Sequence, residues 1–124
     1  MQARFAVRGA VSRGAFALAV LVSLVVLFAP ADEVPAALPG VDTVVHVLLF
    51  AVLALSGRWA GAGPAVLAVG LTGYGALSEV LQAVTPLART GSVADLLADL
   101  AGVAVGLLAW SALRGQAPPG SLGR

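Results

Sequence analysis

Four apolar runs separated by short links dominate the pattern of the chain. An α-helix rises about 1.5 Å per residue and a bilayer has a hydrocarbon core about 30 Å thick, so a run of about 20 apolar residues crosses it. The second run is the shortest, and it crosses only if its ends, from Asp42 to Trp59, are counted. The pattern predicts an all-α polytopic membrane protein, a four-helix transmembrane bundle. The runs are Val11 to Ala29, Val44 to Ser56, Ala65 to Val84 and Val93 to Leu113.

Proline and glycine mark the links between the runs. The first link contains helix-breaking residues, namely Pro30, Pro35, Pro39 and Gly40. Pro86 ends the third helix. No internal repeat divides the chain. We therefore predict one membrane domain over residues 1–114 and a disordered tail, rich in proline, glycine and serine, over residues 115–124.

Composition narrows the class of protein. Hydrophobic residues make up 60% of the chain and charged residues 10%, against about 25% charged in an average soluble domain. The absence of cysteine excludes disulfides, iron–sulfur clusters and thiolate nucleophiles. A net charge of +1 without a basic run argues against a nucleic-acid partner. Membrane lipids are the expected partners, and the sequence leaves the oligomeric state undetermined.

Arginine placement orients the predicted bundle. Six of the seven basic residues, all arginines, lie before the first run, after the second or after the fourth, and only Arg89 lies on the other side. The positive-inside rule then predicts that both termini and the second link are cytoplasmic, in a multi-pass protein of the inner (plasma) membrane. The six are Arg4, Arg8, Arg13, Arg58, Arg114 and Arg124.

The first run has an alternative interpretation as a cleavable signal peptide, because arginines precede it and Ala29-Pro30-Ala31 imitates a cleavage site. The apolar segment of a signal peptide usually spans about 7 to 15 residues, and this run is longer. We therefore expect the first helix to be retained.

Three pairs of polar residues lie near the predicted outer ends of the last three runs. A charged residue inside the bilayer costs at least about 2.5 kcal/mol on insertion scales, so each needs a reason. At about 1.5 Å per residue, His46, Glu79 and Asp99 lie roughly 5, 9 and 10 Å from the outer helix ends. We expect these groups to converge on one outward-opening pocket. The pairs are Asp42 with His46, Glu79 with Gln82, and Asp95 with Asp99.

Each pair taken alone also has a structural interpretation. His46 resembles a packed, hydrogen-bonded core histidine, and Asp42 or Asp95 suits the first turn of a helix, where the dipole favours a carboxylate. Glu79 and Gln82 suit interhelical hydrogen bonds, worth about 0.6 kcal/mol each. Taken together, however, four carboxylates face only Arg89 and His46 as counter-charges. The excess negative charge must be neutralised by protons or a bound cation, or be solvated by water, and this favours a functional cluster.

The order and spacing of these groups resemble the VanZ-like family, named for a protein associated with low-level resistance to the glycopeptide teicoplanin. The resemblance covers residues 41–108 and implies a compact helical membrane domain with a role at the cell envelope. Such proteins usually have lysine at the position of Thr43 and asparagine at that of Asp99, so here an acid replaces an amide. The matching pattern is Asp42-x-x-x-His46, Tyr74, Ser78-Glu79-x-x-Gln82, Pro86-x-x-Arg89 and Ser92-x-x-Asp95-x-x-x-Asp99-x-x-Gly102.

The first functional hypothesis is an enzyme acting on the phosphate head group of a phospholipid or of a polyprenyl-phosphate-linked cell-wall precursor. His46, oriented by Asp42, serves as base or nucleophile, and Glu79 as acid or base. The substrate-binding residues are Arg89, Gln82 and Ser92, with Arg89 gripping a phosphate oxygen. The expected cofactor is a divalent cation held by Asp95 and Asp99.

The second hypothesis is an accessory protein that binds a cell-envelope lipid or precursor without turnover, through the same pocket. A third, a proton or cation pathway, is disfavoured because the polar groups occupy one half of the predicted bundle and the other half offers no relay. The sequence leaves the first two hypotheses open.

Overall fold

The computed structural model describes residues 8–28, 41–84 and 93–115, and within them the secondary structure is helical, with no strand. This confirms the prediction of an all-α chain. The predictions for the first and third links, which include Arg89 and Ser92, and for residues 116–124 of the tail lie outside the described residues. The helices are α1 (Ala10–Phe28), α2 (Val41–Trp59), α3 (Pro64–Val84) and α4 (Val93–Gly115).

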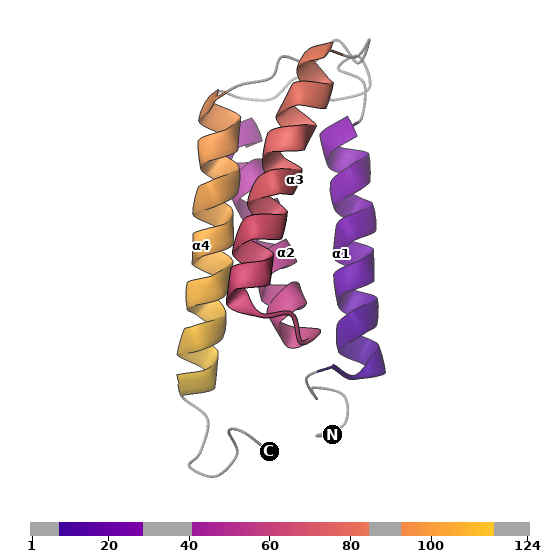
Figure 1. The fold of residues 1–124 in the computed structure, drawn as a ribbon, viewed down its shortest axis with the longest axis vertical. Helices are drawn as coiled ribbons and strands as arrows, with labels where there is room; N and C mark the ends of the chain where they lie inside the picture. The colour runs from indigo at the N-terminus through magenta and orange to yellow at the C-terminus, as the bar shows by residue number, and fades with distance from the viewer. Residues whose placement is uncertain (1–7, 29–40, 85–92, 116–124) are drawn as a thin grey trace.

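The four helices run side by side along the long axis of the molecule (Figure 1). One end of the bundle holds the start of α1, the short α2–α3 turn and the end of α4. The other end holds the start of α2, the end of α3 and the start of α4. We call the first the arginine end, because Arg8, Arg13, Arg58 and Arg114 lie there. The second is the acidic end, because Glu79, Asp95 and Asp99 lie toward it.

Helices α2 and α4 make the closest contact in the bundle, and two glycines of α4 permit it. A Cβ atom on Gly102 would lie 2.3 Å from the backbone oxygen of Val47, and one on Gly106 would lie 2.4 Å from that of Ala51. Both distances are far shorter than a carbon–oxygen contact allows, so only glycine fits. Small residues at four-residue spacing on α4 thus bring the two backbones together.

Helix α1 is attached to α3 by polar contacts. The hydroxyl groups of Ser23 and Tyr74 lie 2.8 Å apart, and the Gln82 side-chain nitrogen donates to the backbone oxygen of Leu27. Leu27 itself is fully buried. The Tyr74 ring packs on Phe50 of α2, with centroids 5.8 Å apart, so one aromatic contact links this seam to the core. These contacts join α1 to both α3 and α2.

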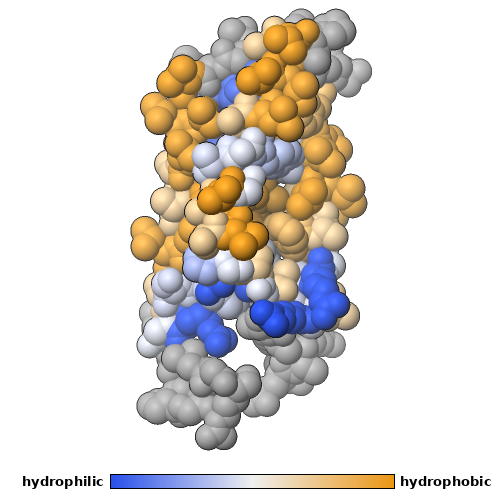
Figure 2. Space-filling view, viewed as in Figure 1, coloured by the Kyte–Doolittle hydropathy of each residue, from blue (hydrophilic) through white to orange (hydrophobic). Residues whose placement is uncertain are grey.

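Large apolar side chains cover the outside of the bundle, where a water-soluble protein would place polar ones. Val69 of α3 is 76% exposed and Val93 of α4 is 75% exposed, and Figure 2 shows apolar residues over most of the visible face. Helices α1, α3 and α4 are each long and apolar enough to cross a membrane. The exterior is therefore suited to lipid rather than to water.

Aromatic and basic residues meet at the arginine end. The guanidinium carbons of Arg58 and Arg114 lie 5.9 and 5.7 Å from the centre of the Trp110 ring, within the range of a cation–π contact. Tryptophan and arginine are the residues that typically anchor a helix at a membrane–water interface. Figure 2 shows strongly hydrophilic residues at this end.

Candidate functional site

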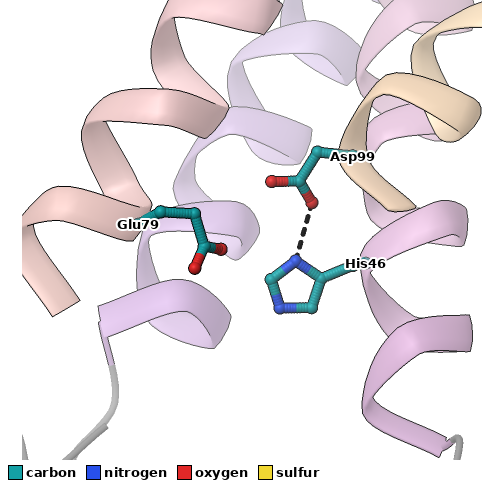
Figure 3. A group of neighbouring side chains, drawn as sticks. All are labelled: His46, Glu79 and Asp99. Carbon is teal, nitrogen blue, oxygen red and sulfur yellow. Dashed lines mark hydrogen bonds and ion pairs between the residues drawn. The ribbon is translucent and has the colours of Figure 1, made fainter. Parts of the chain in front are cut away.

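Three helices contribute one ionisable side chain each to a buried cluster near the acidic end. His46 comes from α2, Glu79 from α3 and Asp99 from α4 (Figure 3). Each lies five or six residues from its helix end, so all three sit at a depth of about 8 Å. The predicted convergence of these three groups is confirmed, and we call them the His–Glu–Asp cluster.

The closest contact in the cluster joins His46 to Asp99. The Nδ1 atom of the imidazole lies 2.6 Å from Oδ1 of the carboxylate, and both side chains are 1% exposed. Such a short hydrogen bond between a carboxylate and an imidazole fixes the orientation of the ring and places a proton on the shared nitrogen. Sequence reasoning assigned this orienting role to Asp42, whose side chain lies outside the described residues.

Glu79 completes the cluster from the opposite side. Its carboxylate points toward His46 and Asp99 in Figure 3, and it is 8% exposed. Each of the three residues offers one nitrogen or oxygen atom that lies within 4.8 Å of the other two. This separation allows a proton, a water molecule or a cation to be shared among them.

Asp99 holds its place because α3 carries a glycine opposite it. A Cβ atom on Gly75 would lie 3.0 Å from Oδ2 and 3.3 Å from the Cβ of Asp99. The Oδ2 atom is buried and has no hydrogen-bond partner among the described residues. The carboxylate is thus pressed against the α3 backbone, with one oxygen on His46 and the other still able to accept.

Gly75→Ala is expected to push the Asp99 carboxylate by a few tenths of an ångström and to weaken its bond to His46. The change in unfolding free energy should stay within about 1 kcal/mol, because alanine also favours the helix. Since His46 is the only histidine, ¹⁵N NMR of its ring reports the bond directly. The matched control is Gly73→Ala, where an added Cβ meets nothing within 4 Å. Identical ring spectra for both variants would contradict the tight-contact explanation.

Among the other predicted site residues, the structure describes the side chains of Asp95 and Gln82. Asp95 lies in the first turn of α4 and is half-buried, so the predicted metal pair contributes only Asp99 to the cluster. Gln82 is buried, and its amide nitrogen donates to the Leu27 backbone, a structural role that explains its burial without a substrate. The roles predicted for Arg89 and Ser92 lie outside the described residues.

Sequence reasoning missed the polar contacts of α1. Ser23 is fully buried and donates to the backbone oxygen of Val20 while it contacts Tyr74. A serine inside an otherwise apolar run is a usable signal, because a hydroxyl group in a lipid-facing helix must find a partner.

Two apolar grooves of the described surface are lined by residues outside the cluster. One, of about 470 Å³, lies between α1 and α2 and is lined by residues such as Leu18 and Leu49. The other, also about 470 Å³, lies nearer the arginine end beside Trp59 and Trp110. Both grooves are lined mainly by apolar side chains, which suit acyl chains rather than a charged head group.

The fold and the site define an all-helical protein with an apolar exterior and a buried histidine–carboxylate cluster near one end. The chain matches no protein-family model, no curated protein and no solved structure.

Proposed function

We propose that the chain is a VanZ-like, multi-pass protein of the inner membrane, with α2 as a fourth membrane span and both termini in the cytoplasm. All described arginines lie at one end of the bundle and the described acidic residues lie toward the other, which supports this orientation through the positive-inside rule. Helix α2 has 19 residues, the same number as α1, so its length also suits a membrane span. The acidic end then faces the outer leaflet.

This orientation predicts that a cytoplasm-active reporter fused after Arg124 is active and that a reporter active only outside the cytoplasm is silent. A fusion in the α2–α3 turn, at Ala62, should give the same result, because that turn and the C-terminal end of α4 lie at the same end of the bundle. Activity of the external reporter at either position would reverse the proposed orientation.

For its activity, we propose acid–base chemistry on the phosphate head group of a membrane lipid or lipid-linked cell-wall precursor. The observation that carries the proposal is the His46–Asp99 bond with Glu79 beside it, because an imidazole held by a carboxylate is a general base or nucleophile and a second carboxyl group can transfer the complementary proton. Burying three ionisable groups at one level of an apolar bundle costs free energy, which favours a functional role for them.

In this scheme Asp99 orients His46 and stabilises the imidazolium that forms when the ring takes a proton. His46 takes a proton from the attacking water, or attacks phosphorus itself to form a phosphohistidine that water then hydrolyses. In either case Glu79 protonates the leaving oxygen as its bond to phosphorus breaks. The low dielectric constant around the cluster strengthens each of these interactions relative to water. Arg89 remains the predicted phosphate-binding residue, and Ser92 a predicted second contact.

The cluster lies in the outer part of the bilayer in the proposed orientation. His46, Glu79 and Asp99 are about 8 Å below the acidic end, in the outer third of a hydrocarbon core about 30 Å thick. A lipid lying against the apolar exterior can present its phosphate at the acidic end while its chains remain in the membrane.

The direct test is a turnover assay with purified protein in mixed micelles, using a polyprenyl phosphate or diphosphate and a phosphatidic acid as substrates. Release of phosphate above that of a mock preparation supports the proposal. Saturable binding of either lipid without turnover would reject the enzyme and leave the accessory function, in which the same residues present or shield a precursor.

A further inference from the structure

We propose that His46, Glu79 and Asp99 form a binding site for a divalent first-row transition metal ion, with Zn²⁺ as the ion that fits best. A bound ion would engage the His46 and Glu79 atoms that the acid–base scheme uses, so in the metal-bound form the ion would take over activation of the attacking water from His46. That use rests on the proposed function, whereas binding of the ion can be measured independently. The site differs from the sequence-based expectation of an Asp95–Asp99 pair, because the structure gathers an imidazole and two carboxylates from three helices.

The donor set argues for a transition metal. Magnesium and calcium prefer oxygen ligands alone, whereas Zn²⁺ accepts imidazole nitrogen together with carboxylate oxygen. Three protein ligands leave a fourth position for water or a phosphate oxygen, as in catalytic zinc sites. Ligands about 2.1 Å from a tetrahedral ion lie about 3.4 Å from one another. The donor atoms already lie within 4.8 Å, so small side-chain rotations suffice.

Asp99 supplies independent support through its second oxygen. Oδ1 is engaged with His46, while Oδ2 is buried without a hydrogen-bond partner in the described part of the chain. An ionised oxygen of this kind is expensive to bury, and a cation would repay the cost. Oδ2 is therefore the oxygen that we assign to the metal, and the ion would replace the proton on Nδ1, so the hydrogen bond from Nδ1 to Oδ1 is lost when the ion binds.

Charge balance points the same way. Glu79 and Asp99 together carry two negative charges when ionised, and one divalent cation beside a neutral imidazole neutralises both. The helices also hold the donors on a packed scaffold, which lowers the cost of assembling the site.

The composition makes the test unusually clean, since the chain has one histidine and no cysteine. Protein purified with a tag that lacks histidine is stripped with a chelator and titrated with Zn²⁺ against a chromophoric competitor in detergent. We expect one ion per chain and no competition from excess Mg²⁺. Glu79→Gln and Asp99→Asn should each weaken binding at least about tenfold, while Asp95→Asn should bind as wild type does.

Ring ¹⁵N NMR of His46 adds a readout besides affinity, since one ring nitrogen should shift in proportion to bound Zn²⁺. Circular dichroism establishes that each variant keeps its helices. Absence of saturable binding by folded wild-type protein would overturn the proposal, as would equal affinity in wild type, Glu79→Gln and Asp99→Asn. Zinc binding without lipid turnover would support the metal site and reject the proposed reaction. Turnover by a metal-free protein that binds no zinc would support the reaction and reject the metal site.

Discussion

Glu79→Gln is expected to lower lipid-phosphate turnover at least about 100-fold while leaving the protein folded, because proton transfer by a positioned side chain typically contributes a factor of about 10² to 10⁴. Glutamine has the shape of glutamate and can still bridge helices through hydrogen bonds, but it cannot donate and recover a proton. The measurement is initial rate at saturating lipid, on variants whose membrane abundance equals that of wild type.

His46→Gln is expected to give a similar loss, because it removes the imidazole from the same cluster. Thr72→Val provides a matched control on α3, two turns from Glu79 and of nearly unchanged volume, and should keep wild-type turnover. Full activity in both Glu79→Gln and His46→Gln would reject the catalytic role of the cluster and favour the accessory function.

Gly102→Val is expected to disrupt the bundle itself, with a loss of unfolding free energy of at least about 3 kcal/mol, at or beyond the upper end of the range for overpacked interiors. An added Cβ would lie 2.3 Å from the Val47 backbone oxygen and 2.9 Å from the Phe50 Cβ, and neither neighbour is a flexible side-chain tip. Helix α4 would have to move away from α2, which also separates Asp99 from His46.

The thermal unfolding midpoint in detergent and the abundance of the protein in membranes both report this effect. Ala104→Val is the matched control, because Ala104 lies two residues away on the same helix and is exposed. Similar midpoints for the two variants would show that α2 and α4 do not depend on their close approach. A folded Gly102→Val protein with an altered His46 ring spectrum would instead place the effect at the site.

The helices themselves could be predicted from residue order alone. Each observed helix begins and ends within three residues of its apolar run, because proline and glycine break the links and a chain in lipid must satisfy its backbone hydrogen bonds locally. The depth of His46, Glu79 and Asp99 was predictable for the same reason, since a helix converts residue count into distance along its axis.

The partners of each side chain required the tertiary structure. Counting residues places Asp42, Asp95 and Asp99 near the same end, but only the rotation of α4 against α2, which Gly102 and Gly106 set through backbone contact, decides that Asp99 meets His46. The same packing engages Gln82 with the Leu27 carbonyl and leaves Asp95 half-buried outside the cluster. Helix rotation is a property of several contacts at once, and sequence spacing fixes positions on one helix without fixing the neighbour that each position faces.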